Sequence, residues 1–372
     1  MVEANGENEA TFNKRVDDAY TGKLPKDLST SLRILVVGSV SSGKSSLINA
    51  LLRRSRGDVL AAVGAESGVT TGVQHYPLDE RIYLFDSPGL ADVRAENSDR
   101  TKKLLTDGVD IGLLVVSGSA DASQRQHYED MKTQCKKVFV VLNKVDHWDK
   151  FRSDALEKVI AQWKDALGVD AIYPTCAAGY DPDHNPDHPL DIRGVDALRT
   201  ALEEFADSEG KALLLKRWTQ DRRELSLKII GGALVTVAGA ALLRATQAVA
   251  ITAIYYVYTG KLLSKSSALA LIPTFLAETI GSSLFIVIKS FLPPTAVLDV
   301  AAAGVAVVVT AAMLLTVSSM LASGATLEER EKLRTKFRAM RGAVGVAVKD
   351  ASFSDYGKES FWTDLLRKLM YS

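Results

Sequence analysis

The stretch Gly38-Ser-Val-Ser-Ser-Gly43-Lys44-Ser45 decides the fold of this 372-residue chain. It matches the pattern GxxxxGK followed by Ser or Thr. It also stands between the apolar run of residues 32–37 and a helix-forming segment. Glycines let the backbone N–H groups of such a loop turn inward around phosphate oxygens, and the positive end of the following helix adds to the attraction. The sequence therefore predicts a phosphate-binding loop between a buried strand and a helix.

The side chains of this loop have distinct expected roles. We expect Lys44 to reach the β- and γ-phosphates of a nucleotide, where it is also catalytic, and the Ser45 hydroxyl to ligate Mg²⁺. The remaining nucleotide-binding positions expected in the loop are Gly38, Ser41, Ser42, Gly43 and Ser46.

A second loop, Asp86-Ser87-Pro88-Gly89, ends the apolar segment 81–85. An Asp at the tip of a strand can hold the shell of Mg²⁺, and a glycine N–H can meet the γ-phosphate and so sense its presence. The sequence Asp-Ser-Pro-Gly is also favourable for a simple turn. The prediction of a nucleotide-binding role therefore rests on the position of this loop after the phosphate loop and at the end of a strand. We expect Asp86 to be a metal-site residue and Gly89 to contribute to catalysis.

A third loop, Asn143-Lys144-Val145-Asp146, follows the apolar run 138–142. A carboxylate there can accept two hydrogen bonds from the N1–H and the 2-amino group of guanine, and adenine offers neither donor. Asn143 can bridge toward N7 and neighbouring loops, and the stem of Lys144 can lie along the ring. The three loops together predict binding of a guanine nucleotide.

These motifs resemble the translation-factor class of P-loop GTPases, and within it the Era/TrmE-like group. The resemblance covers about residues 31–207 and includes Thr175-Cys176-Ala177, which is similar to the Ser-Ala loop of the family. It implies that the backbone N–H of Ala177 meets the guanine O6, with Cys176 as a further nucleotide-binding residue. The implied fold is α/β, a doubly wound, mostly parallel six-stranded sheet. The implied cofactors are GTP or GDP and Mg²⁺, and the implied activity is hydrolysis of GTP to GDP.

The chain also departs from the family at two positions. Leu90 stands where Ras-like proteins place the Gln that orients the attacking water, so we expect slow basal hydrolysis unless another residue, a partner or self-association supplies this group. Ser41 stands where potassium-activated relatives carry Asn, which argues against potassium activation. The segment 68–72 resembles the first switch, whose Thr binds Mg²⁺ when GTP is present; Thr70 and Thr71 are both candidates for this catalytic and metal-binding role.

The rest of the chain differs sharply in composition. Residues 229–324 carry six charged side chains, whereas the remaining 276 residues carry 84. Such a shift marks a domain boundary. We predict a polar leader (1–30), the G domain (31–207), a basic linker helix (208–228), a hydrophobic helical domain that is membrane-embedded (229–327) and a charged helical tail (328–372), so that an all-α region follows the α/β domain.

The apolar half contains possible membrane spans. Residues 300–327 carry no charge and are long enough to cross a hydrocarbon core of about 30 Å. Insertion into the membrane surface and a soluble helical bundle are the alternatives. Basic residues flank both ends of the apolar half, so we expect both flanks to lie in the cytoplasm. The arrangement looks similar to bacterial Era-like GTPases with a hydrophobic C-terminal domain, which implies the bacterial inner membrane as the location.

The main hypothesis is a membrane-anchored GTPase that acts as a nucleotide-dependent switch, with a lipid bilayer and a second copy or a GTPase-stimulating protein as partners. The alternative is a self-assembling, GTP-controlled membrane scaffold or remodelling protein. Nucleic acid is not expected as a partner. Lys plus Arg and Asp plus Glu are equal at 45 each, and no basic RNA-binding module follows the G domain.

Overall fold

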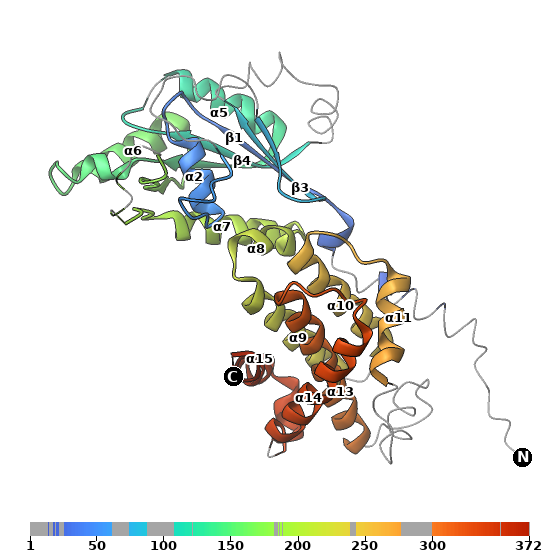
Figure 1. Cartoon of the computed structure of the whole chain (residues 1–372). Coiled ribbons are helices and arrows are strands. Elements are labelled where there is room, and N and C mark those ends of the chain that lie inside the picture. Colours follow the sequence, from blue (N-terminus) through green and yellow to red (C-terminus); the bar gives the residue numbers. More distant parts are fainter. Residues whose placement is uncertain are drawn as a thin grey trace, which may run out of the picture. The chain divides into compact units, whose positions relative to one another are not determined.

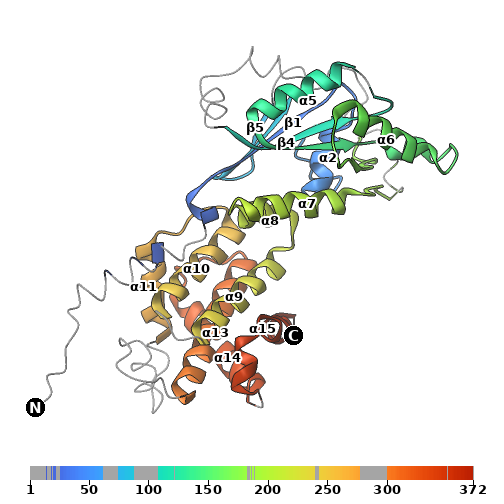
Figure 2. The same cartoon turned by 180° about the vertical axis from the view of Figure 1, so that it is seen from behind.

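The computed structural model describes residues 14, 18, 20–21, 26–61, 74–87, 108–120, 122–181, 185, 187, 189–238, 243–276, 300–349 and 351–371. The chain divides into two compact units, each described by itself. The sheet unit comprises Thr30–Thr219, and the helical unit comprises Met1–Ser29 together with Gln220–Ser372. The two units are drawn in Figures 1 and 2.

The sheet unit is built on six strands in the order β2-β3-β1-β4-β5-β6. Neighbouring strands are parallel except for the antiparallel pair β2 and β3. The strands are β1 (Leu32–Val37), β2 (Gln74–Pro77), β3 (Ile82–Ser87), β4 (Val109–Val116), β5 (Cys135–Leu142) and β6 (Tyr173–Pro174). The central strands are continuous apolar runs because helices cover both faces of a parallel sheet. The predicted doubly wound, mostly parallel six-stranded sheet is confirmed.

Helices cover the sheet on both sides, as Figures 1 and 2 show for α5 and α7. The helices of this unit are α2 (Lys44–Leu51), α5 (Ala122–Gln134), α6 (Ala155–Leu167), α7 (Val195–Ser208) and α8 (Ala212–Thr219), with a 3-10 turn η2 at Val145–Trp148. Leu114 and Val116, two residues apart on β4, lie in one buried cluster with Met131 of α5 and Trp163 of α6. The period of two thus directs one set of side chains toward α5 and α6.

The segment predicted as one linker helix over 208–228 is two helices in the structure. α8 ends at Thr219, and α9 (Arg222–Ala238) begins after Asp221. The Asp221 carboxylate accepts hydrogen bonds from the N–H groups of Arg223 and Glu224 at 2.9 and 3.0 Å, which caps the start of α9. The single-helix prediction was therefore wrong, because Asp221 begins a new helix. The division between the units falls at Thr219 and not at the predicted residue 207.

The helical unit is centred on α13 (Val300–Ala322), which packs against α9, α10 and α14. The other elements are α10 (Leu243–Thr259), α11 (Lys265–Leu276), α14 (Arg330–Ala347) and α15 (Glu359–Tyr371), with 3-10 turns η1 (Lys26–Ser29) and η3 (Phe353–Gly357). Leu333 and Phe337 of α14 and Trp362 of α15 belong to the same buried cluster as α13. The segment predicted as a separate tail thus packs onto the apolar domain.

Among the described residues, one helix is long and apolar enough to cross a membrane, namely Gly304–Ala322. Of the apolar 18-residue window in this stretch, 72% is buried inside the structure. Polar groups inside the unit are paired across helices: the Ser318 hydroxyl lies 2.8 Å from that of Ser226 and 3.1 Å from that of Tyr258. Such paired groups fix the relative register of the helices that they join.

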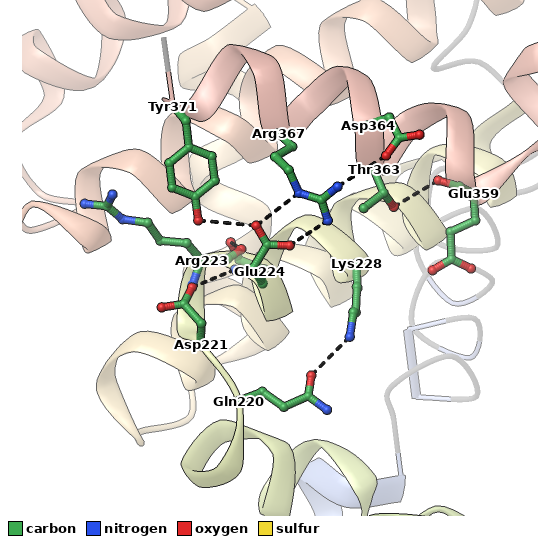
Figure 3. Close-up of polar contacts among 11 residues, drawn as sticks. Gln220, Asp221, Arg223, Glu224, Lys228, Glu359, Thr363, Asp364, Arg367 and Tyr371 are labelled. Carbon is green, nitrogen blue, oxygen red and sulfur yellow. Dashed lines mark hydrogen bonds and ion pairs between the residues drawn. The ribbon is translucent and has the colours of Figure 1, made fainter. Parts of the chain in front are cut away.

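The C-terminal helix α15 is fastened to the start of α9 (Figure 3). The Glu224 carboxylate accepts hydrogen bonds from Arg367 Nε and Nη2 at 3.2 and 2.8 Å and from the Tyr371 hydroxyl at 3.3 Å. Further along α9, a Cβ at Gly231 would lie 3.4 Å from the side chains of Glu359 and Thr363. The glycine therefore lets the two helices approach closely.

Candidate functional site

The loop between β1 and α2 curls into a ring of backbone groups. Ser41 and Gly43 have positive φ angles of 62° and 86°, which turn the chain back on itself before α2 starts. Lys44 Nζ donates hydrogen bonds to the carbonyl oxygens of Gly38 and Ser39, both at 3.1 Å, so the ammonium group lies against the loop. The N-terminus of α2 and a lysine thus meet at one place, which suits an anion.

Two glycines let this loop pack closely against β4 and against Asn143. A Cβ at Gly38 would lie 2.1 Å from the carbonyl oxygen of Val115, and a Cβ at Gly43 would lie 2.4 Å from Nδ2 of Asn143. The Ser42 hydroxyl is buried and has no hydrogen-bond partner among the described residues. A buried polar atom of this kind calls for a partner. The buried Ser42 hydroxyl is therefore a group that a phosphate oxygen bound at this loop could pair with.

The strand register brings the predicted metal residue close to this loop. Asp86 of β3 pairs with Val36 of β1, two residues before the loop begins at Gly38. Ser45 and Ser46 lie in the first turn of α2. For Asp86, the structure describes the backbone only. The predicted residues Thr70, Thr71, Gly89 and Leu90 lie outside the described residues.

Asn143 ties the phosphate loop to the loops that would surround a base. Its Nδ2 donates hydrogen bonds to the carbonyl oxygens of Ser42 and Gly43 at 3.0 and 3.3 Å, and its Oδ1 accepts one from the Thr175 hydroxyl at 3.2 Å. With 2% of its surface exposed, Asn143 acts as a fixed strut between three loops. This agrees with the bridging role that the sequence predicts for it.

Asp146 and Cys176 meet on the neighbouring side. The Cys176 thiol donates a hydrogen bond to Asp146 Oδ1 at 3.2 Å. Burial raises the pKa of Cys176 to about 12, so the sulfur keeps its proton at neutral pH and remains a donor. The Asp146 side chain is 32% exposed, and its other oxygen, Oδ2, lies 4.0 Å from His147 Nε2. Lys144, with a φ of 63°, turns the chain between Asn143 and Asp146.

The backbone at residues 175–178 presents one N–H toward the same place. The Thr175 N–H donates to the last carbonyl of β5 at 2.8 Å. The N–H groups of Cys176 and Ala178 donate instead to the segment 191–193, at 2.8 and 3.0 Å. Because successive N–H groups of an extended segment point to opposite sides, the Ala177 N–H points to the side of β5 and the loop that follows it.

Sequence reasoning missed Arg193. Its guanidinium bonds Asp149, which follows η2, through Nη1 and Nη2 at 3.0 and 2.7 Å. It also bonds Asp191 through Nε and Nη2 at 3.0 and 2.9 Å. Hydrogen bonding to Arg193 lowers the pKa of both carboxyl groups. The short spacing between Asp191 and Arg193 was the only signal in the sequence, since Asp149 is 44 residues away.

A family model described as "50S ribosome-binding GTPase" matches residues 33–144, from β1 through the first residues of the base-reading loop. The sheet unit is a P-loop GTPase domain. This confirms the resemblance to P-loop GTPases; the matched residues include the phosphate loop, the second loop and the first two residues of the third loop. The matched range ends before the helical unit, so the predicted hydrophobic domain is not confirmed by it.

Curated relatives carry GTPase names. The nuclear GTP-binding protein NUG1 of Saccharomyces cerevisiae is 34% identical over 106 residues, covering 26% of this chain and 20% of that protein. Ribosome biogenesis GTPase A of Thermotoga maritima is 34% identical over 101 residues (26% and 37%). The tRNA modification GTPase MnmE of Thermotoga maritima is 28% identical over 185 residues (46% and 40%). The chain thus spans less than half the length of each of these relatives.

Solved structures give weaker likenesses. A crystal structure of Aquifex aeolicus Era bound to GDP.AlF4- is 19% identical, covers 56% of this chain and 68% of that chain, and has a TM-score of 0.33. Another shows Era in complex with MgGDPNP and nucleotides of 16S ribosomal RNA, at 18% identity and the same TM-score of 0.33. At these scores the likeness carries no argument. The expectation that nucleic acid is not a partner gains no support from the comparisons.

Proposed function

We propose that this chain binds guanine nucleotides with Mg²⁺ and hydrolyses GTP to GDP. The observation that carries the proposal is the junction at Asn143, which holds the phosphate loop and the base-reading loop at one edge of the sheet. The match to the family model and the GTPase names of the relatives support it.

The residues divide the work along the nucleotide. The N–H groups of the phosphate loop and Lys44 hold the phosphates and offset their charge. Ser45 and Asp86 would hold Mg²⁺, which when bound neutralises charge on the β- and γ-phosphate oxygens. Asp146 accepts hydrogen bonds from the guanine edge, and the Ala177 N–H meets O6. Leu90 cannot orient water, so unstimulated hydrolysis is slow.

The test of base reading is Asp146→Asn. The amide replaces one of the two acceptors of the carboxylate with a donor, which suits the 2-oxo group of xanthine in place of the 2-amino group of guanine. Preference should therefore move from GDP toward xanthosine diphosphate, measured by titration calorimetry. Asp170→Asn, an exposed change beyond α6, is the matched control. Unchanged preference for guanine in Asp146→Asn would contradict the assignment.

Turnover of many GTP per second by the unstimulated protein would contradict the role given to Leu90.

We also propose that the protein is a nucleotide-dependent switch at a membrane, with the sheet unit on the cytoplasmic side of the bacterial inner membrane. The scarcity of charge over residues 229–324 and the length of Gly304–Ala322 support this location. A specific observation favours a second candidate, a bundle surrounded by water: 72% of the apolar window in that stretch is buried inside the structure.

Alkaline carbonate extraction separates these two candidates. The full chain is compared with a chain truncated at Thr219, where the sheet unit ends. Retention of the full chain in the membrane pellet, with the truncated chain in the supernatant, supports the membrane anchor. Release of both chains refutes an integral anchor and favours the water-surrounded bundle.

A self-assembling scaffold is the alternative to a switch. Sedimentation of the full chain with GDP, GTP or a non-hydrolysable analogue, with and without liposomes, distinguishes them. Polymers that form with GTP and not with GDP support the scaffold. A protein that stays monomeric with every nucleotide supports the switch. Because the names of relatives refer to ribosome biogenesis and tRNA modification, purified ribosomal subunits and tRNA belong in the same experiment as ligands.

A further inference from the structure

Arg193 lies behind both loops that would read a guanine base. On one side its guanidinium makes two hydrogen bonds to the Asp149 carboxylate, at 3.0 and 2.7 Å. Asp149 closes the turn η2, because its N–H donates to the carbonyl oxygen of Asp146 at 3.2 Å. Arg193 thus acts on the turn that carries the base-reading carboxylate.

On the other side Arg193 belongs to the segment that backs the O6-reading loop. Its carbonyl oxygen accepts the Cys176 N–H at 2.8 Å. Ala178 and Asp191 form an antiparallel bridge, with hydrogen bonds of 3.0 and 3.2 Å. The guanidinium also binds the Asp191 carboxylate, which stiffens this segment. The direction of the Ala177 N–H depends on these two anchors.

The ion pairs of Arg193 with Asp149 and Asp191 should contribute little to the stability of the fold, and more to the position of the two loops that they join. Arg193, Asp149 and Asp191 are 51%, 53% and 34% exposed in their side chains, and solvent screens exposed pairs. A forked guanidinium that bonds two carboxylates nevertheless fixes direction as well as distance. Loss of the fork leaves the core intact and frees the two loops to shift relative to each other.

We propose that Arg193 is a positioning residue for base selectivity, which sets the spacing between the Asp146 carboxylate and the Ala177 N–H. This inference rests on the proposed guanine binding. Arg193 would keep the Asp146 carboxylate and the Ala177 N–H at the spacing that lets both contact the same guanine ring. A base that makes fewer contacts with these two groups should therefore depend less on Arg193. Inosine diphosphate is such a ligand, because it keeps O6 and N1–H but lacks the 2-amino group.

The test compares Arg193→Gln with the wild-type full chain in binding GDP and inosine diphosphate by titration calorimetry. We expect GDP binding to weaken by about tenfold, the effect of one misplaced charge-assisted hydrogen bond. Inosine diphosphate should weaken by no more than about threefold, since it forms one contact fewer with the carboxylate. Arg193→Lys, which keeps the charge without the fork, should give an intermediate GDP affinity.

Two further variants sharpen the result. Lys158→Gln removes the same charge from an exposed ion pair with Asp154, 2.7 Å long, on α6 of the same unit and should leave both affinities unchanged. Asp149→Asn breaks the Arg193 bridge from its other end and should reproduce the loss of discrimination. The proposal is overturned if the ratio of GDP to inosine diphosphate affinity is unchanged in both Arg193→Gln and Asp149→Asn. It is also overturned if both ligands lose the same affinity and the melting temperature of the variant falls.

The wild-type titration identifies a failure of the proposed function. If the wild-type protein binds GDP no better than ADP, the proposed guanine binding is wrong and this inference fails with it. If the wild-type protein prefers GDP and the variants keep the full preference, the inference about Arg193 alone is refuted.

Discussion

At the scale of single residues, Gly43 packs closely against Asn143 of the base-reading loop. Gly43→Ala would place a Cβ 2.4 Å from Asn143 Nδ2, on a residue whose φ is 86°. The left-handed conformation alone costs about 1–2 kcal/mol for an alanine. The added Cβ would force Asn143 away from the phosphate loop and from Thr175. We therefore expect GDP affinity to fall at least tenfold, which calorimetric titration measures.

Gly57→Ala is the control for this prediction. A Cβ added at Gly57 would have no atom within 4 Å, and the residue needs no unusual backbone angle, so nucleotide affinity and stability should remain those of the wild type. Equal GDP affinities for the two alanine variants would show that the close approach at Gly43 does not matter for binding.

Asp110 of β4 supplies a prediction about pH. Burial raises the pKa of this carboxyl group, but hydrogen bonds from Lys211 Nζ (2.7 Å), the Arg33 N–H (3.0 Å) and Lys136 Nζ (3.0 Å) outweigh burial, and the pKa is lowered overall. A lowered pKa stabilises the fold above about pH 4, the ordinary pKa of aspartate, and this contribution is lost as pH falls through the folded-state value.

We therefore expect Asp110→Asn to destabilise the sheet unit by about 3 kcal/mol at pH 7, since it leaves the mostly buried Lys211 without its counter-charge. The difference from the wild type should shrink as the pH is lowered below about 4. Urea unfolding at a series of pH values measures both effects, with the exposed Asp165→Asn on α6 as control. A difference that stays constant down to about pH 3 would disprove the ion-pair explanation.

At the scale of elements, the contact between α9 and α15 depends on a glycine. Gly231→Leu would push a side chain into Glu359 and Thr363, whereas the neighbouring Gly232 has nothing within 4 Å of a Cβ. We expect Gly231→Leu to cost about 1–3 kcal/mol and to make α15 sensitive to limited proteolysis. Gly232→Leu should stabilise α9 by about 0.5–1 kcal/mol, because glycine is a poor helix former. Identical proteolysis of the two variants would count against the close packing.

The elements differ in how far sequence could predict them. Strands β1, β3, β4 and β5 were predictable, because parallel strands covered on both faces are continuous apolar runs. β2 (Gln74–Pro77) and β6 (Tyr173–Pro174) are short edge strands whose residues show no such pattern. The break at Asp221 was missed, since an aspartate caps a helix only where the chain turns there.

The candidate site divides in a similar way. Its motif residues were predictable because each loop binds the nucleotide through a fixed local spacing, as in the phosphate loop. Arg193 was not, because its role arises from Asp149, a residue that only the fold brings near. Sequence also could not decide the surroundings of α13, since a lipid environment and a protein core select the same apolar residues.

At the scale of the whole molecule, the two units should respond differently to nucleotide. A ligand at about 100 times its dissociation constant stabilises the form that binds it by about 2.7 kcal/mol. The nucleotide loops lie in the sheet unit, so Mg²⁺ and GDP should raise the unfolding temperature of that unit and leave the helical unit unchanged. Scanning calorimetry of the full chain, with ADP as control, measures this. An equal rise of every transition would show that the units unfold together.

The helical unit draws its residues from both sides of the sheet unit in the chain. The Tyr20 hydroxyl lies 3.0 Å from that of Thr252, a partner 232 positions later in the sequence. On a translating ribosome Tyr20 emerges long before Thr252 exists, whereas the sheet unit is complete once Thr219 has left the exit tunnel. Domains tend to fold as units in the order of synthesis. We therefore expect the sheet unit to fold first, while the helical unit waits for the later segments that pair with Tyr20 and for α15, which closes on α9.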